Sequence, residues 1–335
     1  MVAFETNYAV CSSMLMHVDL MADCGHKINL LISSKIAPDC FKDCNYEKSY
    51  FSSKKDLKNL FKNHYDYLWC TSHVYVNYLK FIVGVKCPIL LWQQGDGPSE
   101  SYMHHHSKFR SFLIRQSLAI AFKMVKGVIF VSNTMADYYR NQYRFNKAYI
   151  VVPCLSEFGS FNTSIEKIPN SFVYIGGLSV WQCFDETLQI YKSVRSDDSV
   201  LHIITLDINK AKEKVRSIIG DEKNIEIYGI TDRSRIPEVL SKFQYGFLIR
   251  RDDIVNYVSS PIKFLEYLSC GVNVIMTSAV PEYAKIVEEY HIGTVVDLNS
   301  ESYIINEFSN KSKEVYNALF DRGYFLNCYK NFLAL

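Results

Sequence analysis

The chain has 335 residues, of which 48% are hydrophobic, and its formal net charge is +2 at pH 7. This length favours two α/β domains over one, and the apolar content excludes global disorder. A near-neutral charge lacks the basic excess of nucleic-acid-binding domains, so we expect no nucleic-acid partner.

In the N-terminal half, short apolar runs alternate with amphipathic stretches. Continuous apolar strands between helices are typical of a parallel sheet that is covered on both faces. The predicted strands are residues 28–33, 67–70, 88–92, 127–131 and 149–152, and the predicted helices are residues 9–23, 74–81, 108–126 and 133–142.

The same alternation returns in the C-terminal half and predicts a second parallel sheet. The predicted strands are residues 172–175, 201–205, 225–228, 245–249, 273–276 and 294–296, and the predicted helices are residues 184–194, 209–219, 236–242, 261–270 and 281–290.

Between the halves, a polar stretch with no clear period contains Gly159 and Pro169. It indicates a linker between two domains. We expect an N-terminal domain over residues 1–158, a linker over 159–170, a C-terminal domain over 171–310, and a helical segment over 311–335 that packs back on the N-terminal domain. The expected fold class is α/β, with two Rossmann-like, doubly wound parallel-sheet domains that face a central cleft holding the ligand.

Cysteine spacing and missing motifs exclude several classes of site. The ten cysteines include no CxxC pair, which favours reduced thiols in a cytoplasmic protein over disulfides or zinc. The sequence contains no DxD, Walker A or GxGxxG pattern, so we expect no metal and no bound cofactor. It has no secretory leader pattern and no apolar run of ~18 residues, and the expected location is therefore cytoplasmic.

The sequence after residue 259 predicts a helix with clear start and stop signals, followed by a strand. Ser260 is placed to cap this helix, Pro261 to occupy its first position, and Gly271 to end it. Exposed N–H groups and the positive dipole end at Ser260–Ile262 favour a phosphate.

Two charged residues follow within the first turns of this helix. Lys263 is unfavourable there for the helix alone but suits a bound anion, and Glu266 could accept two hydrogen bonds from a ribose diol. From spacing alone, an ordinary Lys–Glu surface pair explains the two residues equally well.

The segment SPIKFLEYLSCGVNVI, residues 260–275, resembles the donor-site signature S-P-x-K-x-x-E-Y-x-A-x-G-x-P-V-I of GT-B-fold glycosyltransferases similar to glycosyltransferase family 4. The resemblance implies nucleotide-ribose recognition by Glu266 and donor-diphosphate contact by Lys263. The preceding Leu248-Ile249-Arg250, with Asn256 and Val258, is similar to the branch that makes bacterial surface polysaccharides such as O-antigen or capsule. This similarity makes Arg250 a second diphosphate cation.

The chain departs from the family pattern at three places. Many members carry Glu where this chain has Val258, and Pro where it has Asn273. The Gly-Arg…Lys clamp after the first strand of the domain is replaced by a stretch in which Gly176 and Gly177 still allow close backbone approach to a donor. Trp181, further along this stretch, fits the site or the core equally well.

A second motif follows the predicted strand 88–92, where QQGDGPSES predicts a sharp loop at the cleft end of the sheet. It resembles the Q-G-x-x-P-E-E-S loop of the same branch. The resemblance makes Gln94, Gly95, Asp96 and Glu100 acceptor-site residues, and the two carboxylates are catalytic candidates. The alternative is that Asp96 merely caps its own loop.

The next helix, Lys108–Lys126, carries five basic residues around an apolar stripe. Such a face is usually only solvated, but it could also rest on an anionic membrane that holds a lipid-linked acceptor. The three successive histidines before it, His104–His106, cannot all face one way on a regular element, so a solvated loop is expected rather than a metal site.

Together these features predict a hexosyltransferase that moves a sugar from a nucleoside-diphosphate-sugar to a hydroxyl of a growing, lipid-linked polysaccharide. Family resemblance implies retention of configuration, with Arg250 and Lys263 stabilising the leaving diphosphate without a metal. Two alternatives stay open: a sugar-nucleotide epimerase or hydrolase on the same fold, and a non-catalytic partner subunit. The missing diphosphate clamp and the short N-terminus keep the second alternative open.

Overall fold

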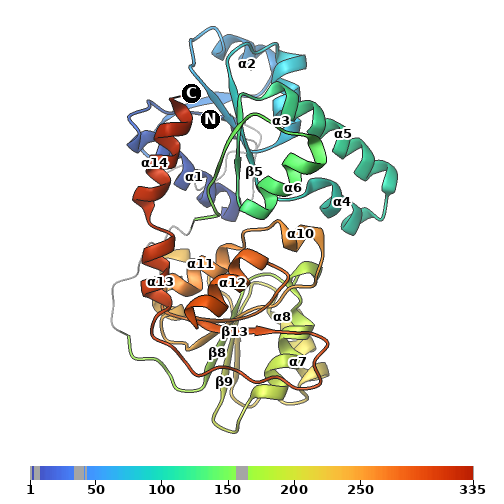
Figure 1. The fold of residues 1–335 in the computed structure, drawn as a ribbon, viewed down its shortest axis with the longest axis vertical. Helices are drawn as coiled ribbons and strands as arrows, with labels where there is room; N and C mark the ends of the chain where they lie inside the picture. The colour runs from blue at the N-terminus through green and yellow to red at the C-terminus, as the bar shows by residue number, and fades with distance from the viewer. Residues whose placement is uncertain (1, 4–7, 34–40, 42–43, 156–164, 335) are drawn as a thin grey trace. The chain divides into compact units, whose positions relative to one another are not determined.

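The structure is a computed structural model that describes residues 2–3, 8–33, 41, 44–155 and 165–334, with side chains from residue 13 onward. The chain forms two compact units, each described here by itself (Figure 1). Unit 1 comprises Met1–Glu157, Val258–Ser260 and Arg322–Leu335, and unit 2 comprises Phe158–Tyr257 and Pro261–Asp321.

Unit 1 contains a parallel sheet of seven strands in the order β3-β2-β1-β4-β5-β6-β7. Its strands are β1 (Val2–Ala3), β2 (Asn29–Ser33), β3 (Glu47–Phe51), β4 (Leu68–Cys70), β5 (Ile89–Gln93), β6 (Gly127–Phe130) and β7 (Ala148–Val151). Its helices are α1 (Tyr8–Asp23), α2 (Lys54–Leu60), α3 (His73–Asn77), the π-helix η2 (Tyr78–Val83), α4 (Gly97–His105), α5 (Lys108–Met124), α6 (Asn133–Tyr143) and α14 (Arg322–Leu333).

All five strands predicted for the N-terminal half are present within one or two residues, and two more strands join them. β3 has no apolar run in its sequence, because it is an edge strand in which only Phe51 is buried. β1 consists of two residues, which is too short for any periodicity. The unpredicted helix α2 has only Leu57 buried, and its start is fixed by a capping box between Ser53 and Asp56.

Unit 2 contains a parallel sheet of six strands in the order β10-β9-β8-β11-β12-β13. Its strands are β8 (Ser171–Ile175), β9 (Val200–Ile204), β10 (Ile225–Tyr228), β11 (Tyr245–Leu248), β12 (Asn273–Thr277) and β13 (Gly293–Val296). Its helices are α7 (Phe184–Val194), α8 (Ile208–Ile218), α9 (Ile236–Leu240), α10 (Ile254–Tyr257), α11 (Ile262–Ser269), α12 (Pro281–Tyr290) and α13 (Ser312–Leu319), with 3₁₀ turns η3 (Val180–Gln182) and η4 (Arg233–Arg235).

Both sheets follow the doubly wound order, in which the first three strands lie in reverse order on one side and the later strands on the other. The predicted pair of parallel-sheet α/β units is therefore confirmed. In the core of unit 2, Phe172 stacks against both Tyr245 and Phe247, with ring centroids 5.3 and 5.7 Å away. No described helix is long and apolar enough to cross a membrane.

The two units are not successive along the chain. Val258–Ser260 lie within unit 1, although the residues on both sides belong to unit 2. The terminal helices also divide, because α13 packs on α11 in unit 2 whereas α14 packs on α1 and β7 in unit 1. Of the segment 311–335 that was expected to return to the N-terminal domain, only α14 does so. Much of the expected linker, residues 159–164, lies outside the described part of the chain.

The return of α14 depends on buried contacts with residues from the start of the chain. Tyr329 is fully buried, and its hydroxyl lies 2.6 Å from Nδ1 of His17 on α1. A Cβ added to Gly127 on β6 would lie 2.6 Å from the ring of Phe332. Glycine at this strand position therefore makes room for the helix, and α14 is part of the unit 1 core (Figure 1).

Candidate functional site

The strand order of unit 2 identifies where a ligand fits. β8 lies between β9 and β11, and the chain changes direction across the sheet at this point. In doubly wound sheets, ligands bind at the carboxyl ends of the strands beside such a switch point. The segments in question are the loop after β8, which begins at Gly176, and the loop after β11, which contains Arg250.

Helix α11 supplies the next part of this site, and its start differs from the prediction. Pro261 occupies the N-cap position rather than the first helical position. The Ser260 hydroxyl accepts a hydrogen bond from the Cys154 backbone N–H at 3.0 Å, and Ser260 belongs to unit 1. The helix ends as predicted: Gly271 has a φ of +69° and follows the C-cap Cys270.

The Lys263 side chain lies against the backbone of Gly176. A Cβ on Gly176, whose φ is +134°, would come within 2.5 Å of Cε and Nζ of the lysine. Nζ donates to Oε1 of Gln182 at 2.7 Å and lies 4.4 Å from the ring centroid of Tyr174. Burial lowers the pKa of Lys263 well below its usual value, and neighbouring Arg250 lowers it further against an opposing effect of Glu266.

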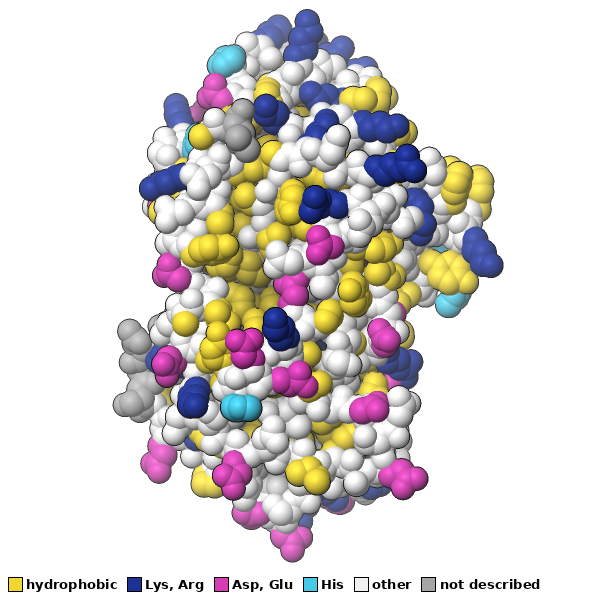
Figure 2. Space-filling view, viewed as in Figure 1, with side chains coloured by type: hydrophobic (Ala, Val, Ile, Leu, Met, Phe, Trp, Pro, Cys, Tyr) yellow, Lys and Arg dark blue, Asp and Glu magenta, His cyan; other side chains and the backbone are white. Residues whose placement is uncertain are grey.

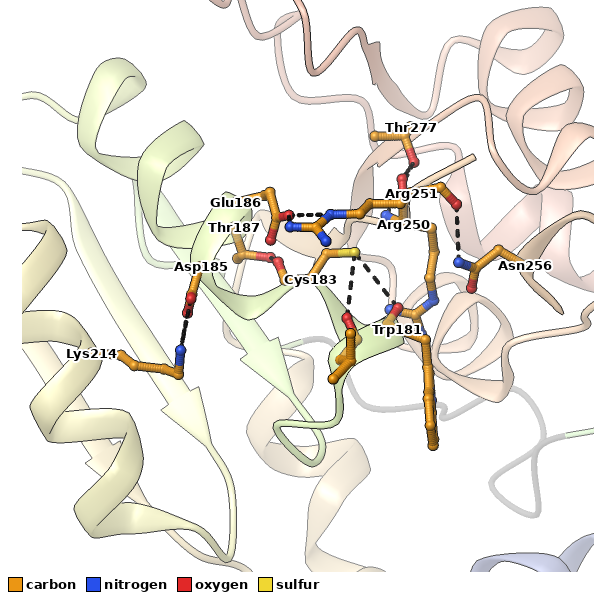
Figure 3. Close-up of polar contacts among 11 residues, drawn as sticks. Trp181, Cys183, Asp185, Glu186, Thr187, Lys214, Arg250, Arg251, Asn256 and Thr277 are labelled. Carbon is orange, nitrogen blue, oxygen red and sulfur yellow. Dashed lines mark hydrogen bonds and ion pairs between the residues drawn. The ribbon is translucent and has the colours of Figure 1, made fainter. Parts of the chain in front are cut away.

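Arg250 is the second buried cation at this place, with 5% of its surface exposed. Figure 3 shows its side chain extending toward the loop that carries Trp181, whereas Arg251 turns to Glu186 on α7. The Arg250 guanidinium donates to the carbonyl of Ile249 at 3.0 Å. Burial lowers the pKa of this guanidinium.

The two buried cations lack a carboxylate in direct contact among the described residues. Within the described part of the chain, neither Arg250 nor Lys263 forms an ion pair with Asp or Glu, although each is less than 10% exposed. Burying one unpaired charge costs several kcal/mol, and a like charge alongside adds to the cost. The arrangement is therefore suited to an anionic ligand that neutralises both.

Glu266 lies one turn beyond Lys263 and is itself neutralised within the protein. Its side chain is 4% exposed, and Oε1 accepts from Nη2 of Arg233 at 2.6 Å. Arg233 comes from η4, which follows β10 at the same carboxyl edge of the sheet. The structure thus brings Glu266, Lys263 and Arg250 together, and it adds a cation that the sequence pattern did not identify.

The remaining predicted donor residues frame the same place. Pro261 and Ile262 form the partly exposed start of α11. Gly177 accepts a hydrogen bond from the Tyr174 hydroxyl at 2.5 Å through its carbonyl, and a Cβ there would meet open space. Beside Arg250, a cavity of about 220 Å³ opens at the ends of β11, β12 and β13, with Thr277 and Asn299 in its lining.

Unit 1 carries the other predicted group, and its local structure corrects the expected loop. Only Gln94–Asp96 form the turn, because α4 begins at Gly97. Both oxygens of the buried Asp96 carboxylate are occupied: Oδ2 accepts from Ser99 N–H at 3.1 Å and Oδ1 from the Tyr139 hydroxyl at 2.8 Å. Asp96 therefore caps the start of α4, as the alternative interpretation of this residue predicted.

Glu100 has a different environment from Asp96. Its carboxylate folds over Gly95, where an added Cβ would overlap Oε1. Burial raises the pKa of Glu100, and the nearby Asp96 raises it further. A carboxyl group with a raised pKa is a better proton acceptor than an ordinary glutamate.

Four further residues support these groups and had no motif to reveal them: Tyr139, Tyr174, Gln182 and Arg233. Each follows or faces the carboxyl end of a strand, so the general rule for parallel sheets was the available signal. Their side-chain partners are distant in sequence, and no spacing pattern encodes such pairs.

Other features of the described residues do not match the predicted donor site. The described residues contain no cluster of three or more His, Cys, Asp or Glu side chains that could hold a metal. His104 and His105 form the last turn of α4 and His106 caps it, which corrects the loop predicted for them. A cavity of about 880 Å³ in unit 1 is lined by residues that precede β4 and β5, such as Tyr67 and Pro88, and so lies at the amino edge of the sheet.

No protein-family model and no curated protein sequence matches the chain. Solved structures do match over nearly its full length. AviGT4, a glycosyltransferase of avilamycin A biosynthesis, has a TM-score of 0.61 at 12% identity, over 98% of this chain and 88% of its own. Anabaena HepE, solved with UDP and glucose, has a TM-score of 0.61 at 10% identity, over 99% and 92%.

A glycosyltransferase from Rickettsia africae matches with a TM-score of 0.62 at 12% identity, over 99% of this chain and 92% of its own. The chain has the GT-B glycosyltransferase fold. The predicted fold class and the resemblance in fold are thereby confirmed. In this GT-B chain, the unit that carries Arg250, Lys263 and Glu266 is the second of the two parallel-sheet units.

Proposed function

We propose that this GT-B chain is a hexosyltransferase that takes a sugar from a nucleoside-diphosphate-sugar and transfers it to a glycan hydroxyl. The observation that carries the proposal is the pair of buried cations Arg250 and Lys263, which form no ion pair with a described carboxylate. They lie beside the close-approach glycine Gly176 at the switch point of unit 2. A diphosphate supplies the missing negative charge, and the backbone at Gly176 allows it to approach closely. HepE, which shares the fold, was solved with UDP and glucose.

The transfer step needs charge stabilisation at the leaving group. The bond between the anomeric carbon and the diphosphate oxygen breaks, and its electron pair stays on that oxygen. The acceptor oxygen bonds to the anomeric carbon on the same face, and its proton passes to the departing phosphate, so configuration is retained. Arg250, Lys263 and the start of α11 stabilise the developing charge, and the proposal requires no metal.

Residues Gln94–Glu100 in unit 1 are proposed to bind the acceptor. Glu100 orients the acceptor hydroxyl, because its carboxyl group lies over Gly95 and has a raised pKa. Asp96 holds the turn in shape through Ser99 and Tyr139, and it supports Glu100 rather than reacting itself. Gln94 and Gly95 supply polar backbone and side-chain groups at the same turn.

We further propose that the acceptor is lipid-linked and that α5 rests on an anionic membrane. Residues 101–136 contain no Asp or Glu, while α5 carries Lys108, Arg110, Arg115 and Lys123. Its exposed face also presents Phe109, Phe112 and Leu113 at 72%, 54% and 51% exposure.

Figure 2 shows hydrophobic, basic and histidine side chains gathered over α4 and α5. Apolar side chains amid cations are typical of interfacial helices. WaaG, of lipopolysaccharide biosynthesis, shares the fold with a TM-score of 0.54.

The test of the function combines binding and turnover. Calorimetry with UDP and GDP should show binding of one of them, and product mass with a panel of sugar nucleotides should show transfer to a glycan acceptor. Glu266→Ala should reduce transfer by at least about 100-fold, because two hydrogen bonds from the ribose to a charged acceptor are lost, while the circular dichroism spectrum stays unchanged.

Two results would support the alternatives instead. Release of nucleoside diphosphate at full rate without an acceptor indicates a hydrolase, and binding of neither UDP nor GDP indicates a non-catalytic subunit. Near-normal transfer by Glu266→Ala would remove Glu266 from the site.

A further inference from the structure

The pair of Arg233 and Glu266 differs from the other ion pairs of unit 2 in its burial. The carboxylate of Glu266 is 4% exposed and the guanidinium of Arg233 is 23% exposed, with 2.6 Å between Nη2 and Oε1. The pair of Arg216 and Glu222 has the same distance but is 68% and 40% exposed. Surface pairs contribute little, whereas a buried carboxylate depends on its partner to remain ionised.

The two residues come from different parts of the sheet edge. Arg233 begins η4, whose N-cap Asp232 fixes the turn by accepting hydrogen bonds from the backbone and hydroxyl of Ser234. Glu266 lies in the middle of α11, among buried neighbours. The contact therefore ties the loop after β10 to the helix that carries Lys263.

We infer that Arg233 is a positioning residue for nucleotide binding: it holds the buried Glu266 carboxylate in place and supplies the positive charge beside it. This inference rests on the proposed function and adds a residue to it. A carboxylate has about four lone-pair positions on two oxygens, so it can accept from an arginine and from a ligand hydroxyl at the same time. Without the cation, the buried carboxyl group takes up a proton at a higher pH and becomes a poorer acceptor.

The experiment measures UDP and GDP affinity by calorimetry between pH 5 and pH 9 and follows the nucleotide that the wild type binds more tightly. Arg233→Gln should weaken binding about 10- to 100-fold at neutral pH and move the acidic limb of the affinity profile upward by about one pH unit or more. Arg233→Lys, which retains the charge, should restore most of the affinity. Arg235→Gln, an exposed arginine in the same turn, is the matched control and should bind like the wild type.

A double-mutant cycle separates positioning from direct contact. Because Arg233 acts through Glu266, Glu266→Gln and the double variant Arg233→Gln/Glu266→Gln should bind equally well. If Arg233→Gln alone fails to fold, Glu266→Gln and the double variant can still be compared, because the double variant leaves neither member of this ion pair charged.

Three outcomes would overturn the inference. The first is that Arg233→Gln binds the nucleotide with wild-type affinity and wild-type pH dependence. The second is that Arg233→Gln weakens binding as much in the Glu266→Gln background as in the wild type. The third is that Arg235→Gln weakens binding as much as Arg233→Gln does. A wild-type chain that binds neither nucleotide would instead overturn the proposed function, so the two failures are distinguishable.

Discussion

At the residue scale, the candidate donor site combines groups that are each unfavourable without a ligand. Lys263 is buried beside Arg250, and both pKa values are lowered by burial. Buried charges that destabilise the free protein are common at functional sites, because a bound ligand can neutralise them. Gly176 is needed for the same reason, since any side chain there would collide with Lys263.

Proton uptake on nucleotide binding follows from the lowered pKa of Lys263. A bound diphosphate favours the charged amine and raises this pKa, so the complex holds more protons than the free protein. Affinity should therefore fall as the pH rises from the pKa of the free lysine to that of the bound lysine.

Calorimetry in buffers of different ionisation enthalpy measures this uptake directly. Lys263→Met should abolish the uptake and weaken UDP or GDP binding by at least about 10-fold, as expected for loss of a charge-assisted contact. Lys285→Met, on α12 in the same unit, is the control. Equal proton uptake in Lys263→Met and the wild type would contradict the role given to Lys263.

At the element scale, the packing of α1 and α14 carries its own titratable group. His17 is 1% exposed and lies between Trp92, with ring centroids 4.4 Å apart, and the hydroxyl of Tyr329. Burial lowers the pKa of His17 to about 3. The neutral imidazole is therefore the form that fits this core.

Acid should destabilise unit 1 through this histidine. An unfolded histidine takes up a proton below about pH 6.5, whereas His17 in the folded chain does so only near pH 3. The contribution of neutral His17 to the free energy of unfolding is complete above pH 6.5 and is lost as the pH falls toward 3. The loss is about 2 kcal/mol at pH 5.

Denaturant unfolding at pH 7 and pH 5 measures this contribution. The difference in unfolding free energy between the two pH values should be about 2 kcal/mol smaller in His17→Phe than in the wild type. His26→Gln, which changes an exposed histidine, should show the same difference as the wild type. Identical pH dependence in His17→Phe and the wild type would show that His17 does not carry the effect.

At the scale of the whole molecule, a net charge of +2 conceals an uneven distribution. The acid-free segment 101–136 places α5, with its exposed Phe109 and Phe112, on the surface of unit 1. Electrostatic attraction and apolar insertion act together in such a helix.

Vesicle sedimentation tests the membrane proposal. Binding to anionic phospholipid vesicles should exceed binding to zwitterionic ones and should weaken at high salt. Phe109→Ser/Phe112→Ser should lower the partition coefficient by at least about 10-fold, because two aromatic side chains leave the interface. Leu206→Ser/Ile304→Ser, which alters residues of unit 2 that are 74% and 85% exposed, is the control. Equal loss in both variants would contradict docking through α5.

The sequence by itself determined the elements with strong patterns and the C-terminal end of α11. Buried strands such as β5 and β12 read as continuous apolar runs, and Gly271 ends its helix as expected. Two parallel sheets, and hence the carboxyl edge where a ligand binds, follow from the alternation of such strands with helices. Lys263 and Glu266 were identified because the segment 260–275 resembles a family motif; their spacing alone left a surface ion pair equally possible.

Only the tertiary structure decided which groups meet across the chain. The partners of Glu266, Lys263 and Tyr329 are Arg233, Gln182 and His17, the last 312 residues away. It also assigned α14 and Val258–Ser260 to unit 1 and showed Asp96 occupied by Tyr139. Periodicity reports only contacts within an element, whereas these contacts depend on how separate elements pack, and for that reason no spacing in the sequence encodes them.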